Sequence, residues 1–267
     1  MSDALLIEEH DADGLEGVVR ITLNRPEAFN ALSEAMLDAL QRCLDGIAAT
    51  DARVVVIGGA GRAFCAGHDL KEMRAQPSLA YYQRLFARCS QMMLTLQRMP
   101  QPVIARVHGI ATAAGCQLVA MCDLAVAASD ARFAVSGVNY GLFCATPSVP
   151  LTRNLSRKAA FEMLVTGDFI DAQTAQARGL VNRVAAPDQL DEATRALAAS
   201  ICDKPRAAIA AGKALFYRQL ETGIEAAYQQ AGQTMACNMM DDAALEGTQA
   251  FIDKRAPSWR NARGDVS

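Results

Sequence analysis

Two spacings of apolar residues alternate along the first two-thirds of the chain. Residues 17–23 (GVVRITL) alternate β-branched side chains, which predicts a strand, and residues 54–57 (VVVI) form the continuous apolar run typical of a strand buried on both faces. Between them, Ser33 can cap a helix. Its apolar face comprises Met36, Leu37, Leu40, Cys43, Leu44 and Ile47.

A second strand-and-helix pair follows. The apolar pattern predicts a helix over residues 79–99, which Pro100 and Pro102 stop, and a strand over residues 103–107. After Val184 the pattern changes, because residues 187–202, 204–220 and 224–254 read as helices with no strand between them. We therefore expect an α/β core over residues 1–200 and a helical region over residues 201–267.

The composition limits which partners and which cellular compartment we expect for this chain. Of 267 residues, 51% are hydrophobic and 21% charged, which describes a folded globular protein. The net charge is -3, and Lys and Arg form no consecutive block, so we do not expect the chain to bind nucleic acid or a membrane surface. We expect its partners to be small molecules or further copies of the chain. The eight cysteines form no CxxC pair, which favours reduced thiols. The acidic N-terminal residues contain neither a basic leader nor an apolar segment, which favours a cytoplasmic location.

Two small-residue segments follow predicted strands. Residues 58–64 (GGAGRAF) begin like a dinucleotide-binding loop, but Phe64 stands where the third glycine should be, and the alternative is a plain turn. Residues 109–117 (GIATAAGCQ) lead into a helix, where unpaired backbone N–H groups can bind negative charge; close packing of helix on strand is the alternative, and the better one for this segment alone. Taken together, the two loops predict a pair of backbone donors for a developing enolate oxygen.

Further motifs make a resemblance specific. Residues 23–32 (LNRPEAFNAL), 63–73 (AFCAGHDLKEM), 108–123, 166–184 and 246–255 resemble, in this order and spacing, the signatures of the enoyl-CoA hydratase/isomerase (crotonase) superfamily. Within that family, residues 139–147 with His68-Asp69-Leu70 are similar to the branch of the enoyl-CoA hydratase domain-containing protein 3. The resemblance implies a superhelix of ββα turns with a helical trimerisation tail, hence a homotrimer or a dimer of trimers.

The resemblance also implies roles for residues. The two oxyanion donors would be the backbone N–H groups of His68 and Ala114. Coenzyme A would enter as part of an acyl-CoA thioester substrate, not as a permanently bound cofactor. Its contacts would come from the adenine-binding loop and from the tail, often the tail of a neighbouring subunit: Ala66, His68, Asp69, Leu70, Phe251 and Lys254. A solvated lysine at a helix end is an equal alternative for Lys254. No metal site is expected, because His10, His68 and His108 are unclustered.

The sequence departs from the family pattern where hydration needs two glutamates. Gln117 stands at the first of these positions and Gly137 at the second. A carboxamide cannot take a proton from water and glycine has no side chain, so ordinary hydration should be weak or absent. His68 could act as a substitute base oriented by Asp69, although a binding-loop role is the simpler interpretation.

Three functions remain open. Residues expected to line the acyl pocket could hold substrate or water: Ser136, Asn139, Tyr140, Cys144 and Thr146. A Ser136–His68–Asp69 hydrolase lacks the usual turn around its serine. The chain could be an acyl-CoA enzyme that uses unconventional proton transfer for isomerisation, decarboxylation or retro-Claisen cleavage. It could instead be a non-catalytic acyl-CoA-binding or regulatory protein, or a structural oligomer without affinity for CoA.

Overall fold

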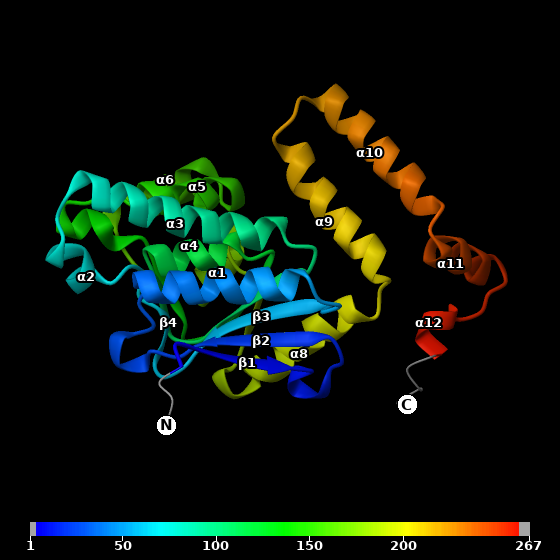
Figure 1. Cartoon of the computed structure of the whole chain (residues 1–267), viewed down its shortest axis with the longest axis horizontal. Coiled ribbons are helices and arrows are strands. Elements are labelled where there is room, and N and C mark those ends of the chain that lie inside the picture. The colour runs from blue at the N-terminus through cyan, green and yellow to red at the C-terminus, as the bar shows by residue number, and fades with distance from the viewer. Residues whose placement is uncertain (1–3, 262–267) are drawn as a thin grey trace.

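The computed structural model describes residues 4–261. Strands of two sheets and the helices on them form its core (Figure 1). A six-stranded sheet has the order β1-β2-β3-β5-β7-β10, all neighbours being parallel except β1 and β2. Its strands are β1 (Leu6–His10), β2 (Val18–Leu23), β3 (Val54–Gly59), β5 (Val103–Val107), β7 (Leu124–Ala128) and β10 (Arg183–Ala185).

A second, four-stranded sheet has the order β4-β6-β8-β9. Its strands are β4 (Ala63–Cys65), β6 (Ile110–Thr112), β8 (Arg132–Ala134) and β9 (Ile170–Asp171). Strands β3, β5 and β7 of the large sheet are each followed by a strand of the small sheet and then by a helix. The expected ββα superhelix is thus confirmed.

Helices cover both faces of the large sheet. The helices of the core are α1 (Glu34–Ala48), α2 (Leu70–Ala75), α3 (Leu79–Arg98), α4 (Ala114–Met121), α5 (Ala145–Asn154), α6 (Arg157–Thr166), α7 (Ala172–Arg178) and α8 (Leu190–Cys202). In β3, Val55 and Ile57 pack with the side chains of α1 and α3, whereas Val54 and Val56 pack with those of α8. This two-sided burial explains the continuous apolar run.

Helix α1 forms as the sequence predicts. The Ser33 side chain accepts a hydrogen bond from the Met36 N–H at 3.2 Å, and the apolar face from Met36 to Ile47 is buried against the sheet. Helix α3 ends at Arg98, directly before Met99 and Pro100, because proline cannot continue a helix.

The C-terminal helices extend away from the core (Figure 1). They are α9 (Arg206–Leu220), α10 (Ile224–Met239), α11 (Asp242–Ile252) and α12 (Ser258–Asn261). The prediction of one helix over residues 224–254 is wrong: it breaks at Met240, and α11 starts after Asp241, whose carboxylate accepts from Asn238 Nδ2 at 2.7 Å. The predicted helix at 187–202 begins only at Leu190, after a short turn over residues 187–189.

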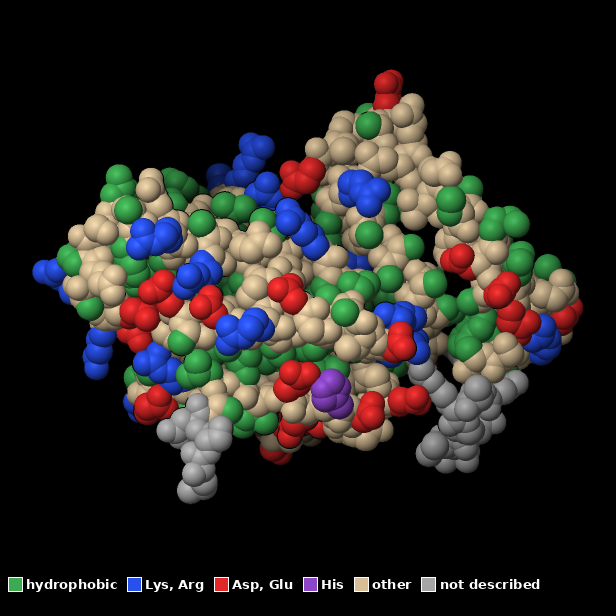
Figure 2. Space-filling model, viewed as in Figure 1, with side chains coloured by type: hydrophobic (Ala, Val, Ile, Leu, Met, Phe, Trp, Pro, Cys, Tyr) green, Lys and Arg blue, Asp and Glu red, His purple; other side chains and the backbone are tan. Residues whose placement is uncertain are grey.

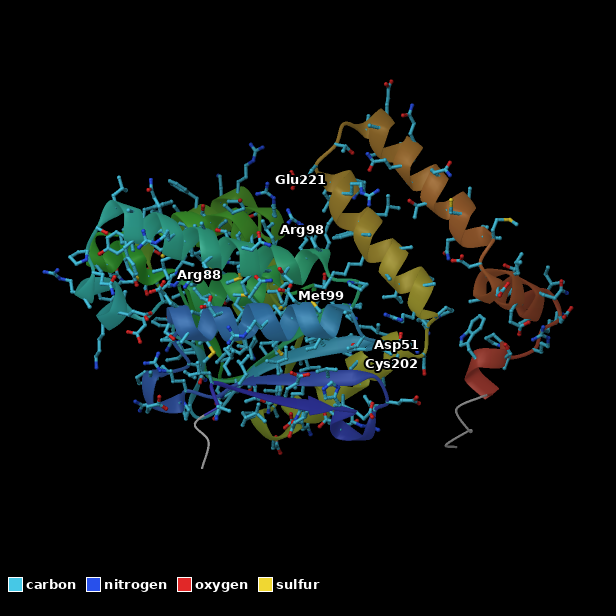
Figure 3. The ribbon with its side chains drawn as sticks, in the orientation of Figure 1. Asp51, Arg88, Arg98, Met99, Cys202 and Glu221 are labelled. Carbon is cyan, nitrogen blue, oxygen red and sulfur yellow. The ribbon has the colours of Figure 1, made fainter. Side chains whose placement is uncertain are left out.

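Polar contacts fasten α9 to the core at both ends. Figure 3 shows Asp51 and Cys202 near the start of α9 and Glu221 beyond its end. Asp51 pairs with Arg206 at 2.6 Å, and Glu221 pairs with Arg153 of α5 at 3.1 Å. The predicted division at residue 200 falls within the last turn of α8, and the oligomerisation role of the region after it stays a prediction.

Large apolar side chains lie exposed on the C-terminal helices (Figure 2). They include Tyr228, Met235, Met240, Phe251 and Ile252, of which Phe251 is 85% exposed. Such a surface is typical of a protein interface. Within residues 4–261, no helix combines the length and the apolar character that crossing a bilayer requires.

Candidate active site

The first candidate donor lies in the loop that joins β4 to α2. Gly67 has a φ of +92°, which favours glycine, and its carbonyl accepts a hydrogen bond from the Leu32 N–H at 2.8 Å. The Ala66 carbonyl accepts from the Thr112 hydroxyl at 2.9 Å. These contacts fix the backbone directly before the His68 amide.

The second candidate donor lies at the start of α4. Ala113 precedes this helix with φ 49° and ψ -119°, a conformation that costs energy for any residue with a Cβ. Its N–H donates to the Ala134 carbonyl at 3.0 Å, which ties this turn to β8. Ala114 is the first residue of α4, where a backbone N–H has no partner within the helix.

The two loops touch. A Cβ built on Gly67 would lie 3.1 Å from the Ala114 N atom and 2.9 Å from Ala113 Cβ. A Cβ on Gly115 would lie 2.1 Å from the Cys65 carbonyl oxygen, so β4 and α4 approach to a distance that only glycine allows. Neither the His68 N–H nor the Ala114 N–H has an acceptor within residues 4–261. The structure therefore brings into contact the two loops that carry these amides, which the sequence places in separate ββα turns.

The His68 side chain points into packed surroundings. Its Nδ1 atom lies 3.3 Å from the Leu32 carbonyl oxygen, which can only accept, and its ring meets the edge of Phe86 at 5.5 Å between centroids. Burial lowers the pKa of His68, opposed only in part by the Leu32 carbonyl, so the ring is neutral at pH 7. Its Nε2 atom is buried and lacks a partner among the described residues.

Asp69 does not orient His68. One carboxylate oxygen accepts from the Lys71 and Glu72 N–H groups and caps α2, and the other pairs with Arg25 at 3.0 Å. Although burial opposes ionisation, the Glu72 amide and Arg25 lower the pKa of Asp69. Arg25 lies far from Asp69 in the sequence, and no local signal predicts this pair.

Gln117 lies one turn into α4, at the end that carries the Ala114 amide. Its side chain is buried, with 3% of the residue exposed, and makes no hydrogen bond with the described residues. The buried Oε1 atom is one of few unpaired side-chain atoms in the core. Buried amides normally find a partner, so this side chain is suited to one supplied by a ligand or water.

The backbone of a neighbouring loop fills the space beside Gly137. A Cβ at this position would lie 2.5 Å from the Leu142 carbonyl oxygen and 2.7 Å from Cys144 Sγ. The Gly137 N–H also points at Cys144 Sγ, 3.3 Å away. Burial raises the pKa of the Cys144 thiol, which the Gly137 amide offsets only in part. The sequence alone does not indicate that this thiol lies at the place that a side chain at residue 137 would occupy.

The remaining candidate residues fall into two groups. Ala66, Asp69 and Leu70 lie together beside His68, and Leu70 is 58% exposed. Phe251 and Lys254 lie at the end of α11, across the molecule from α2 (Figure 1). A single chain therefore does not bring the two groups together.

The glycine-rich turn over residues 58–62 is not part of this candidate site. Together with Arg106 and His108, the turn lines an open cavity of about 530 Å³ at the corner between the two sheets. No βαβ unit surrounds it, because β3 leads directly into β4. No group of three potential metal ligands occurs within the described part of the chain.

The chain is similar to known proteins over nearly its whole length. Residues 13–262 match the family described as enoyl-CoA hydratase/isomerase. The rat mitochondrial enoyl-CoA hydratase domain-containing protein 3 is 44% identical over 245 residues, covering 91% of this chain and 82% of the relative. The Escherichia coli 2,3-dehydroadipyl-CoA hydratase is 35% identical over 245 residues, covering 91% of this chain and 95% of the relative.

Solved structures agree. An enoyl-CoA hydratase from Mycobacterium smegmatis superposes with a TM-score of 0.94 at 64% identity, covering 96% of this chain and 99% of that one. The human enoyl-CoA hydratase domain-containing protein 3 gives 0.91 at 42% identity, covering 96% and 100%. By its sequence, its fold and its similarity to the domain-containing protein 3 branch, the chain belongs to the enoyl-CoA hydratase/isomerase family.

Proposed function

We propose that this protein binds acyl-CoA thioesters and stabilises a thioester enolate through the backbone N–H groups of His68 and Ala114. The observation that supports the proposal is the contact between the loops that carry these amides, neither of which has an acceptor among the described residues. Each such donor typically contributes roughly 10²–10³ in rate. Family membership supports lyase or isomerase chemistry on CoA thioesters in general.

Ordinary enoyl-CoA hydration is expected to be weak or absent. Hydration needs a group that takes a proton from water and one that returns a proton to carbon, and each typically contributes roughly 10²–10⁴. Gln117 cannot take a proton, and the loop over residues 142–144 leaves no room for a side chain at Gly137. The word hydratase in the names of the relatives refers to those proteins and is not carried over to this chain.

We infer a composite CoA site in a homotrimer or a dimer of trimers. Ala66, His68, Asp69 and Leu70 would contact the adenine, while Phe251 and Lys254 would reach the nucleotide end from a neighbouring copy. The distance between the two groups within one chain and the exposure of Phe251 support this arrangement. The cytoplasmic location also stays a prediction, since the names of several relatives include the word mitochondrial.

The deciding experiment combines two measurements on the full chain: acetyl-CoA binding by calorimetry and crotonyl-CoA hydration. Binding without hydration at ordinary hydratase rates is expected. Rapid hydration would overturn the assignment of residues 117 and 137, and absence of binding would favour a structural oligomer. Binding without turnover of any thioester would favour the alternative function, a non-catalytic acyl-CoA-binding or regulatory protein.

Removing one donor tests the amide pair directly. Ala114→Pro deletes the N–H at the first position of α4; because Ala113 lacks the extended conformation that suits a following proline, circular dichroism must show that this variant keeps its fold. Arg157→Pro deletes the N–H at the first residue of α6, where Ser156 is extended, and is the control for the loss of a helix-start amide as such. We expect Ala114→Pro to lower turnover at least tenfold while acetyl-CoA still binds, and Arg157→Pro to change neither.

A further inference from the structure

The peptide unit between Gly67 and His68 contains the first candidate donor. Its carbonyl and its N–H point in opposite directions, because the peptide is planar and trans. The Gly67 carbonyl accepts a hydrogen bond from the Leu32 N–H at 2.8 Å, so the His68 N–H points away from that residue. A hydrogen bond to the carbonyl of a peptide also polarises the N–H of the same peptide and strengthens it as a donor.

The two candidate donors differ in what holds their peptides. The Ala113 carbonyl, in the peptide that carries the Ala114 N–H, accepts from the Gln117 N–H at 3.0 Å, a bond that α4 makes within its own first turn. The peptide of His68 lies in a loop and follows Gly67, whose φ of +92° gives it no helical support. The direction of the first donor therefore depends on contacts with other segments of the chain.

The His68 ring supplies one of these contacts, through a second hydrogen bond to Leu32. The Leu32 carbonyl can only accept, so the ring Nδ1 atom, 3.3 Å from its oxygen, carries the hydrogen and donates it. Leu32 is fully buried and forms a parallel bridge with His68. One fixed residue thus binds the loop twice, through the carbonyl before the donor amide and through the side chain after it.

A row of aromatic side chains from α3 supports the ring from the other side. The edge of the His68 ring meets Phe86 with 5.5 Å between centroids and 62° between planes. Phe86 stacks on Tyr82 at 6.3 Å, and the Tyr82 hydroxyl donates to the Met73 carbonyl of α2 at 3.1 Å. The row therefore connects α3 both to the donor loop and to the helix that follows it.

The second ring nitrogen shows why a histidine at this position needs an explanation. Nε2 is buried and has no partner within residues 4–261. A buried polar atom without a partner is unfavourable, and a leucine would fill a similar space without that cost. What histidine provides and leucine lacks is the Nδ1 donor to Leu32.

We propose, on the basis of the function given above, that the His68 side chain is a positioning group for its own backbone. Its hydrogen bond to Leu32 and its contact with Phe86 hold the Gly67–His68 peptide with the N–H facing the thioester oxygen. A donor that is fixed before the ligand binds needs no rearrangement when negative charge develops on that oxygen. Removing the ring donor should therefore weaken the binding of an enolate more than that of a neutral thioester.

Acetoacetyl-CoA measures this difference, because its enolate absorbs ultraviolet light at longer wavelength than its keto form. At about pH 8, where histidine side chains are neutral, the ratio of enolate to keto form is read for the bound ligand and for the ligand in buffer. Wild-type protein should raise this ratio at least about tenfold, as expected for a hydrogen bond to a charged acceptor.

Two variants of His68 separate the donor from packing. His68→Leu keeps the approximate volume without a donor and should lower the bound ratio at least about threefold, while acetyl-CoA affinity, measured by calorimetry, stays within about twofold. His68→Asn, whose side-chain amide places a donor near the position of Nδ1, should recover most of the wild-type ratio. His10→Leu, on the exposed edge strand β1, is the control and should match wild type.

Each outcome bears on a different statement. An unchanged ratio in His68→Leu, or an equal loss in His68→Asn, would overturn the positioning role, and a parallel loss of acetyl-CoA affinity would reduce it to a structural one. If His68→Leu fails to fold, nitrogen NMR of the wild-type ring decides, since a hydrogen on Nε2 in place of Nδ1 would also overturn the proposal. Wild-type protein that binds acetyl-CoA without enriching the enolate would refute the proposed function itself.

Discussion

The Lys213 ammonium group of α9 lies 2.7 Å from the Asp123 carboxylate directly before β7, and the two side chains are only 7% and 13% exposed. Lys213 also donates to the Leu96 and Gln101 carbonyls, at 2.7 and 2.8 Å. Asp123 accepts further hydrogen bonds from Tyr217 and from the Val103 N–H. This network attaches the middle of α9 to the core, between the ion pairs at its two ends.

Removing the lysine should therefore be costly. Lys213→Met leaves the Asp123 carboxylate buried without its cation, and breaking such pairs typically costs about 3–5 kcal/mol. Urea unfolding of the variant measures the loss. Asp51→Asn, between α1 and β3, removes the exposed ion pair with Arg206 at the start of α9; it is the control and should change the free energy of unfolding little. Equal effects of the two changes would mean that the buried network does not hold α9.

A methyl group at residue 137 should destabilise the fold. In Gly137→Ala the new Cβ meets the Leu142 carbonyl oxygen and Cys144 Sγ, and overpacking typically costs about 1–3 kcal/mol. Gly46→Ala is the control, because Gly46 lies within α1 with open space around it and should gain roughly 0.5–1 kcal/mol. Thermal unfolding of both variants distinguishes the two sites, and a stable Gly137→Ala protein would show that the loop over residues 142–144 yields easily.

This crowding has a consequence for rebuilding a hydratase. Introducing Glu at both 117 and 137 would not simply restore two carboxylates, because the second requires the 142–144 loop to move. Failure of that double variant would therefore indicate a reshaped pocket.

Contact between β4 and α4 should control activity. Gly115→Ala places a Cβ 2.1 Å from the Cys65 carbonyl oxygen, which must separate the two candidate donors. We expect loss of turnover and weaker acetyl-CoA binding, measured by calorimetry on samples whose fold is checked by circular dichroism. Gly212→Ala in α9, where nothing lies within 4 Å of the new methyl group, should retain both properties. Full activity of Gly115→Ala would argue against the amide pair.

Stability should fall with pH below neutrality. Burial lowers the pKa of His68 and of His108, so the unfolded chain, whose histidines titrate near 6.5, binds more protons in the window below that value. Their contribution is thus complete above about pH 6.5 and is lost as pH falls toward the folded pKa. Replacing both by Gln should flatten the decline below about pH 6.5, measured by urea unfolding, and an unchanged slope would exclude these two groups as its source.

Lys254 should recognise a phosphate. If its ammonium group meets the 3'-phosphate of CoA, wild-type protein should bind acetyl-CoA roughly tenfold more tightly than acetyl-dephospho-CoA, a difference of about 1.4 kcal/mol. Lys254→Gln should abolish this preference, whereas Lys158→Gln at the exposed start of α6 should preserve it. Calorimetry with both ligands gives the comparison, and a preference that survives Lys254→Gln would assign that lysine to solvent.

The sequence predicts local features well and distant pairings poorly. The apolar run of β3 and the Ser33 cap both reflect interactions within a short window, and both form as expected. The break at Met240 was missed because apolar residues continue at helical spacing on both sides of it. The Lys213–Asp123 network and the crowding at Gly137 depend on how separate segments pack, which no periodicity reveals.

Placing the candidate donors on the backbone shifts where mutation does harm. Any amino acid except proline supplies the same N–H group at residue 68 or 114, so the reactivity of these two side chains matters less than their packing, and their size is restricted at the buried Ala114. Gly67 and Gly115 cannot be replaced in this way, since a Cβ at either would push the loops apart. The positions least tolerant of inherited change are therefore glycines, and a search for reactive side chains would overlook them.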